Sequence, residues 1–145
     1  MVRVQASQII NRPQADVFQF VATDHFTNHP RWDPSIVEME QTSTGPMGVG
    51  TTARLVRLDR GKRTEGTVKI TEYQPHQRFA AVVSFGPFVL HQQAQVEAPE
   101  TNCSRLTLTI DTQATGIMRA LLPLLSGTFR RTMTESLRRI KEMVE

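Results

Sequence analysis

Few polar side chains in this chain sit where they could do chemistry, and Gln92 has the position that most favours binding a ligand. The hairpin turns define a strand register that places Gln92 on the apolar face of a sheet, between Ala81 and Ile110. A buried amide needs hydrogen-bond partners, which a ligand, a water or a neighbouring side chain such as Thr112 could supply. Gln92 therefore indicates either a binding site or an internal polar contact.

Two histidines have a spacing that could hold a metal ion. His25 and His29 are four residues apart, which places both on one face of a helix, and Asp24 or Asp33 could add a third ligand. The predicted helix is short, however, and Pro30 follows it directly. We therefore expect solvated surface histidines here and no metal site.

Motifs for nucleophilic catalysis and for cofactor binding are missing from the sequence. His91 points to the polar side of the predicted sheet, and Cys103 follows a loop with no base beside it. No glycine-rich phosphate loop, HExxH or CxxC pattern is present. We expect no cofactor and assign no catalytic residue.

Length, charge and hydropathy limit the classes of protein to which this chain can belong. The 145 residues predict one domain spanning 1–145, and the single cysteine excludes an intrachain disulfide. A net charge of +3 is too small to indicate a nucleic-acid partner. The longest apolar run, residues 120–125, is too short for a membrane span. Because residues 1–10 lack the apolar centre of a secretory signal, we expect a cytoplasmic location.

An apolar stripe at helical spacing runs through the last thirty residues and predicts one long amphipathic helix. Such a helix must bury its stripe against one face of a sheet. Its other faces carry basic residues, which predict a solvated surface or, alternatively, contact with anionic lipid headgroups or an acidic partner. The stripe consists of Met118, Leu122, Leu125, Phe129, Met133, Leu137, Ile140 and Val144.

Before that helix, the sequence predicts a first strand over residues 2–10, a helix opened by Pro13, and a short second helix over 25–29. A strand over 36–41 and five more up to residue 112 follow. Tight turns at 60–61, 75–76 and 86–87 set the register, so that directly opposed residues share a face.

This register collects apolar side chains on one face of the sheet, where the terminal helix should lie. Arg57 falls on the same face, close to a strand end, where we expect it to reach solvent. The apolar face comprises Ala53, Leu55, Val68, Ile70, Phe79, Ala81, Val83, Phe85, Phe88, Leu90, Ala94, Val96, Leu106, Leu108 and Ile110.

The order of one strand, two short helices, six strands and one long helix resembles the helix-grip fold of START-like proteins, the SRPBCC superfamily. Within that superfamily the chain resembles the polyketide cyclase/dehydrase and lipid-transport group. Short segments spread over nearly the whole chain carry the resemblance, namely residues 10–13, 17–21, 32–36, 48–51, 71–79, 105–107 and 121–125. It implies an α+β fold in which a curved antiparallel sheet of about seven strands wraps around the C-terminal helix.

The resemblance implies a cavity between sheet and helix that holds a small hydrophobic molecule such as a lipid, polyketide, isoprenoid or aromatic. Trp32 then lies at the cavity mouth, as a wall or as a plug of the core. The expected lining is Trp32, Val83, Phe85, Phe88, Leu90, Gln92, Leu108, Ile110, Met118, Leu122, Leu125 and Phe129.

Two other functions stay open at this point. The first is a polyketide cyclase or dehydratase acting in the same cavity, although the inward-facing set offers no histidine and no central carboxylate for acid–base work. The second is a protein-interaction module that uses the basic helix face. For the oligomeric state we expect a monomer or a homodimer.

Overall fold

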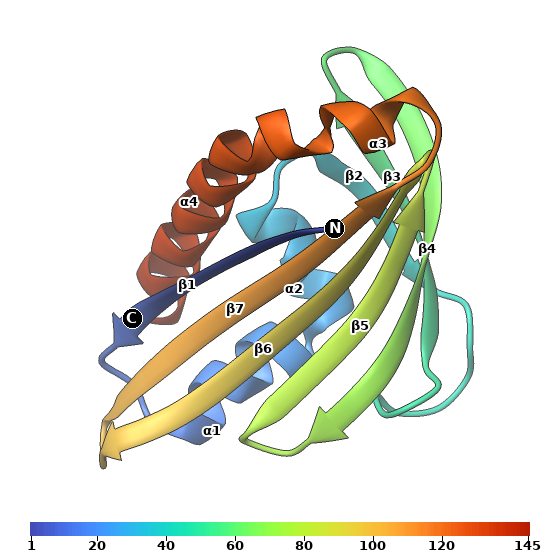
Figure 1. Ribbon diagram of the computed structural model, residues 1–145. Helices are drawn as coiled ribbons and strands as arrows, with labels where there is room; N and C mark the ends of the chain where they lie inside the picture. The colour runs from blue at the N-terminus through green and yellow to red at the C-terminus, as the bar shows by residue number, and fades with distance from the viewer.

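The computed structural model describes residues 1–145, and a curved sheet of seven antiparallel strands dominates it (Figure 1). The strand order is β1-β7-β6-β5-β4-β3-β2, so the first strand pairs with the last and the sheet has β1 and β2 at its edges. The strands are β1 (Val2–Ile10), β2 (Ile36–Gln41), β3 (Thr52–Asp59), β4 (Lys62–Gln74), β5 (Arg78–Phe85), β6 (Phe88–Glu100) and β7 (Cys103–Ala114).

The helical segments lie on the concave side of this sheet (Figure 1). Helix α4 runs beside the β1 edge, α1 and α2 close one end, and α3 crosses the opposite end. No helix is long and apolar enough to cross a membrane. The segments are α1 (Gln14–Phe18), the π-helical turn η1 (Gln19–Thr23), α2 (His25–Trp32), α3 (Ile117–Leu121), the 3₁₀ turn η2 (Leu122–Leu125) and α4 (Ser126–Val144).

The hairpin register predicted from the turns is confirmed along most of the sheet, but the turn predicted at 75–76 is a loop over 75–77, and a bulge between Ile70 and Glu72 restores the predicted Ile70–Ala81 pair. Ala53 pairs with Val68, which in turn pairs with Val83 of β5. Gln92 pairs with Ala81 on one side and Ile110 on the other, as expected. The β3–β4 turn holds its two central residues at φ 52° and 80°, the left-handed conformation that matches the twist of a two-residue hairpin.

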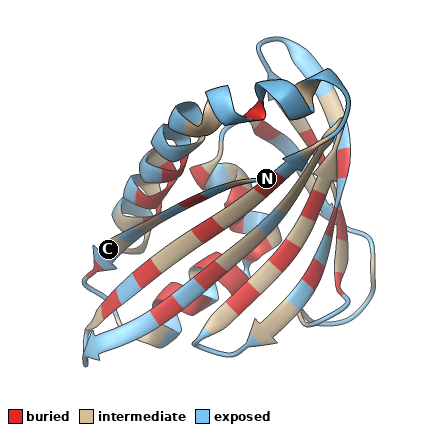
Figure 2. Ribbon diagram, viewed as in Figure 1, coloured by how far each residue is buried: buried red, intermediate tan, exposed pale blue.

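A single hydrophobic core of 20 buried residues fills the concave side near α1, α2 and the second half of α4. Buried and exposed positions alternate along the strands, as a sheet with one covered face requires (Figure 2). The core is anchored by fully buried side chains such as Phe18, Ile70, Leu106 and Ile140.

The C-terminal helix differs from its prediction, because it is not continuous from residue 118. Pro123 lacks the N–H that would bond to the carbonyl of Arg119, and its ring clashes with the preceding turn. The chain therefore forms a 3₁₀ turn at Leu122–Leu125 and changes direction before α4 begins at Ser126 (Figure 1). The predicted stripe nevertheless faces inward, since all eight of its residues are buried or half-buried.

The second helix also differs, because α2 continues through Pro30 to Trp32 where the prolines were expected to end it. An internal proline costs about 3 kcal/mol. Burial of the Trp32 side chain offsets that cost, and Ser136 of α4 donates a hydrogen bond to the Trp32 carbonyl at 3.2 Å.

Candidate ligand-binding site

Gln92 occupies the middle of a row of inward-facing side chains that crosses five strands. The row runs Val4, Ile110, Gln92, Ala81 and Ile70, and its other four members are apolar. The amide is half-buried and makes no hydrogen bond to any protein group. It therefore has unused donors and acceptors on the concave face.

Thr112 is the second polar side chain on this part of the face. It pairs with Leu90, which places it diagonally across from Gln92. Thr112 is 4 % exposed, and its hydroxyl makes no hydrogen bond to the protein. The internal Gln92–Thr112 contact that the sequence left open is therefore not formed.

All twelve predicted lining residues lie on the inner side of the fold, but their burial differs along it. Trp32, Val83 and Leu122 are buried. Nine are only half-buried: Phe85, Phe88, Leu90, Gln92, Leu108, Ile110, Met118, Leu125 and Phe129. Phe85, Phe88 and Leu90 lie at the end of β5 and β6 that α3 and η2 cover, Met118 and Leu125 lie on α3 and η2 themselves, and Phe129 lies on α4.

The main core does not extend into this end. Phe88, Met118, Leu122 and Leu125 all face inward but lie outside the cluster of 20 residues and outside the side chains packed against it. Of these four, Leu122 is buried, whereas Phe88, Met118 and Leu125 stay half-buried beneath the α3–η2 segment.

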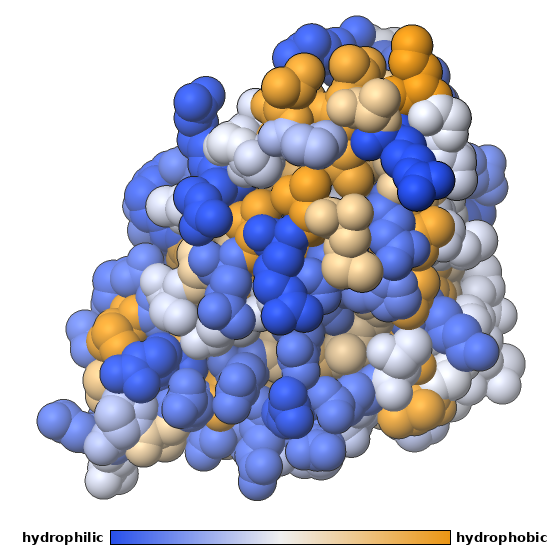
Figure 3. All heavy atoms as spheres, in the orientation of Figure 1, coloured by the Kyte–Doolittle hydropathy of each residue, from blue (hydrophilic) through white to orange (hydrophobic).

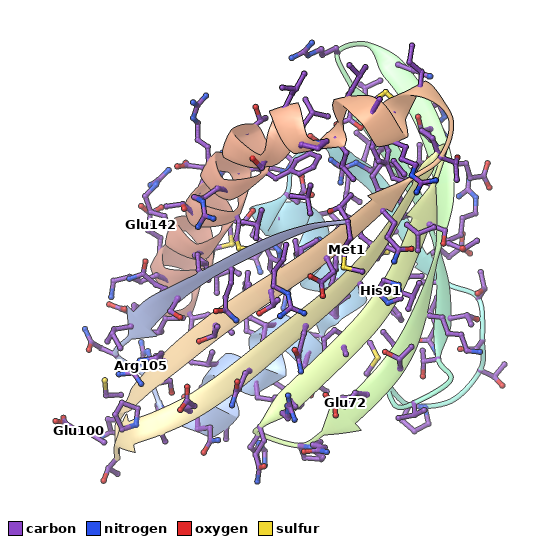
Figure 4. All side chains as sticks on the ribbon, viewed as in Figure 1. Met1, Glu72, His91, Glu100, Arg105 and Glu142 are labelled. Atoms are coloured by element: carbon purple, nitrogen blue, oxygen red, sulfur yellow. The ribbon has the colours of Figure 1, made fainter.

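Two surface hollows lie elsewhere. One, of about 310 Å³, is bordered by Asp16, Gln19, Phe20, Asp24, Met143 and Val144, between the α1–η1 segment and the end of α4. The other, of about 170 Å³, lies over β4–β7 and is bordered mainly by polar residues, including His91 and Asp111, with Ala81 and Gln92 also at its border. Figure 4 shows His91 and Arg105 on the outer face of the sheet, away from α1 and α2.

His25 and His29 are buried, which corrects the expectation of solvated histidines. They are 4 % and 6 % exposed, and their rings lie 4.6 Å apart against Trp32 and Phe79. The sequence did not indicate an amphipathic α2, because the buried side of this helix carries His25, Asn28, His29 and Trp32 and no aliphatic residue.

Burial keeps both imidazoles neutral. Desolvation lowers the pKa of His25 to about 4, opposed by the hydrogen bond from its Nδ1 to the Val21 carbonyl at 2.9 Å. The pKa of His29 is lowered well below its usual value by burial, and then by His25 and Arg57. Nε2 of His25 and Nδ1 of His29 have no hydrogen-bond partner. No group of three or more His, Cys, Asp or Glu side chains is placed to hold a metal ion.

Arg57 is also more buried than expected, with a side chain that is 18 % exposed. It bonds Asp33 at 3.0 Å and Asp59 at 3.2 Å, and its guanidinium lies 5.1 Å from the centre of the Phe85 ring. Burial opposes the charge on Arg57, but the two carboxylates outweigh it and raise the pKa. Because two carboxylates balance one guanidinium, Arg57 ties α2 to the sheet and leaves no free positive charge for an anionic ligand.

Comparison with known proteins agrees with this architecture. All of residues 1–145 match the family described as polyketide cyclase / dehydrase and lipid transport. The chain belongs to this family. Among curated proteins, none matches the sequence.

Solved structures with the same fold are distant in sequence. A START superfamily protein from Mycobacterium smegmatis superposes with a TM-score of 0.81 at 12% identity, covering 98% of this chain and 96% of that one. The Zhui aromatase/cyclase from Streptomyces sp. R1128 superposes with a TM-score of 0.78 at 14% identity, covering 99% of this chain and 93% of that one. A protein from Thermus thermophilus superposes with a TM-score of 0.78 at 18% identity, covering 99% of this chain and 97% of that one. The fold is thus the START-like helix-grip fold.

Proposed function

We propose that this protein binds a small hydrophobic molecule, such as a lipid, polyketide, isoprenoid or aromatic, between the concave face of the sheet and the α3–η2–α4 segment. The supporting observation is the set of inward-facing but half-buried apolar side chains outside the main core. Each gains about 25 cal/mol for every Å² that a ligand removes from water. Family membership agrees with this class of function.

Gln92 and Thr112 would orient the ligand. Both face the concave side with no hydrogen bond to protein, so each offers a donor and an acceptor to a ligand hydroxyl or carbonyl. The charge balance around Arg57 does not favour a ligand carboxylate. A neutral ligand with one or two polar groups fits these side chains best.

The alternative is a cyclase or dehydratase acting in the same place, which the family also includes. Such chemistry needs a group that exchanges protons near neutral pH. The inner side does carry His25, which the sequence did not place there, with a free Nε2. Because its pKa is lowered to about 4, His25 stays neutral near pH 7 and takes protons poorly. Binding without turnover is therefore the better-supported function.

A protein-interaction role through the basic face of α4 has less support. Arg138 pairs with Glu135 and Glu142, and Lys141 pairs with Glu145. Arg139 is 3.6 Å from Glu135. The acidic partners on the same helix cancel most of the positive charge that the sequence suggested for an acidic partner protein.

The experiment uses Trp32, the single tryptophan, as an internal reporter of titration with an apolar probe such as 1-aminoanthracene. We expect saturable binding that changes the Trp32 fluorescence. Leu125→Gln should weaken binding because Leu125 is half-buried and faces inward, whereas Leu124→Gln is a matched control at a side chain that is 79 % exposed.

Thermal unfolding of both variants separates a binding defect from a folding defect. Saturable probe binding that is weakened only in Leu125→Gln supports the proposal. Equal binding by both variants, or no saturable binding by the wild-type protein, would overturn it. Native mass spectrometry of freshly purified protein then identifies any co-purified molecule.

A further inference from the structure

Three large aliphatic side chains on α3 and η2 face solvent. Ile117 is 76 % exposed, Leu121 is 40 % exposed and Leu124 is 79 % exposed. They are spaced by four and three residues, so they share one side of the segment, and each directly precedes a residue of the inward-facing stripe. Figure 3 shows apolar atoms gathered over this segment with hydrophilic atoms around them. We call Ile117, Leu121 and Leu124 the α3 patch.

The charges on the segment that carries the α3 patch have one sign. Residues 112–134 contain no aspartate or glutamate, and they carry three arginines, Arg119, Arg130 and Arg131. All three are exposed and none forms an ion pair. The arginines farther along α4, such as Arg138, are paired with glutamates of the same helix. Free positive charge on the C-terminal segment is therefore concentrated beside the α3 patch.

A second element brings the same kind of surface to this end of the molecule. The tip of the β3–β4 hairpin lies at the end that α3 crosses (Figure 1). It exposes Leu58, which is 46 % exposed, and Arg60 and Lys62, which are exposed and have no ion pair. Two segments distant in sequence thus present exposed aliphatic and unpaired basic side chains at one end of the fold.

We propose that this end of the protein docks on the surface of an anionic lipid bilayer. The α3 patch enters the interface between headgroups and acyl chains, and the surrounding basic side chains contact lipid phosphates. Burial of a few aliphatic side chains combined with several free basic residues is what peripheral attachment requires. Each basic residue near an anionic surface contributes about 1 kcal/mol.

A protein partner fits this surface less well. Stable protein interfaces bury roughly 1,200–2,000 Å² in all, with an apolar centre. Three aliphatic side chains on a segment of nine residues, with arginines beside them, form a narrow ridge and cannot supply that area alone. A bilayer adapts its shape to a ridge and provides the negative charge. Docking on a bilayer depends on this surface alone and requires no bound ligand.

The test is co-sedimentation with vesicles of phosphatidylcholine, with and without phosphatidylglycerol. We expect binding to the phosphatidylglycerol vesicles that decreases as ionic strength rises. The variant Ile117→Ser/Leu124→Ser and the variant Arg119→Gln/Arg130→Gln/Arg131→Gln should each bind at least about tenfold more weakly. All of these side chains are exposed, so thermal unfolding should change little.

Matched controls come from other surfaces of the chain. Val49→Ser removes an aliphatic side chain that is 70 % exposed in the loop after β2, and Lys69→Gln/Arg105→Gln removes unpaired charges from the outer face of the sheet. These variants should bind as the wild-type protein does. Equal loss in the controls and the patch variants, or no wild-type binding to either vesicle, would overturn the proposal. So would concentration-dependent dimerisation that Ile117→Ser/Leu124→Ser abolishes in the absence of vesicle binding.

Discussion

Replacing Gln92 with leucine tests whether the inner face of this sheet carries a polar side chain that binds a ligand and has no hydrogen-bond partner in the protein without ligand. The amide is half-buried in a row whose nearest members, Ala81 and Ile110, are apolar, and it bonds no protein group. If the amide serves only a ligand, the protein without ligand should be more stable when the amide is removed.

The expected gain can be bounded from the burial of Gln92. A fully buried polar group without a partner costs about 1–3 kcal/mol, and partial exposure moves Gln92 to the lower end of that range. Leucine also adds apolar contact with the same neighbours. We expect Gln92→Leu to raise the free energy of unfolding by about 1 kcal/mol, or the melting temperature by about 3 °C for a chain of this length.

Denaturant unfolding followed by Trp32 fluorescence measures this change, since Trp32 is 6 % exposed in the folded protein. The control is Gln95→Leu, which lies on the same strand, is exposed, and pairs across the outer face with Thr107. Gln95→Leu should leave the stability unchanged within about 0.5 kcal/mol.

A loss of stability in Gln92→Leu would refute the reasoning, because it would mean that the amide stabilises the empty protein through a water or an internal network. The binding experiment gives an independent check. Probes with a hydroxyl or carbonyl group should bind Gln92→Leu more weakly, whereas purely hydrocarbon probes should bind at least as well as they bind the wild-type protein.

Two further perturbations test the fold that positions this site. Gly66→Ala should destabilise the protein by about 2 kcal/mol, because a Cβ at Gly66 would lie 2.4 Å from the Ser84 carbonyl oxygen, whereas Gly48→Ala meets no atom within 4 Å and should be nearly neutral in the same denaturant experiment. Because the folded protein holds the pKa of buried His25 at about 4, below its unfolded value of about 6.5, the unfolded chain binds an extra proton between these values. Stability should therefore fall as pH decreases through this window, by up to about 3 kcal/mol for this group. The free energy of unfolding, measured across that pH range, should depend less steeply on pH in His25→Phe than in the wild-type protein, whereas the control His91→Gln should keep the wild-type dependence. An unchanged pH dependence in His25→Phe would contradict the assigned cause.

Strand pairing could be predicted from the sequence because it depends on local rules. Tight turns at 60–61 and 86–87 fix which residues face each other, and the alternation of side chains fixes which face they share. The 86–87 turn placed Gln92 opposite Ala81, and the structure confirms this pair as well as the pairing with Ile110 that was expected across the longer β6–β7 connection. The inward direction of the C-terminal stripe followed in the same way from helical periodicity.

The burial of His25, His29 and Arg57, which the sequence did not predict, depends on contacts between segments far apart in the chain. His25 and His29 are buried because α2 packs against the sheet and α4, which no pattern within residues 25–32 shows. Arg57 is drawn inward by Asp33, 24 positions away. The break before α4 follows from Pro123, whose effect on the preceding turn is local and could have been predicted from the sequence.

Local patterns in the chain were enough to establish the antiparallel strands, their register and the side that a helix must cover, because short-range sterics and the separation of apolar from polar side chains set all three. How densely the interior is packed is decided only by the tertiary structure. Side chains of α1 and α2 such as Phe18 and Trp32 belong to the buried core, while Met118 of α3 and Leu125 of η2 stay half-buried and Gln92 keeps its amide free. Packing density depends on how surfaces from several elements fit in three dimensions, and no single segment of the chain encodes that fit.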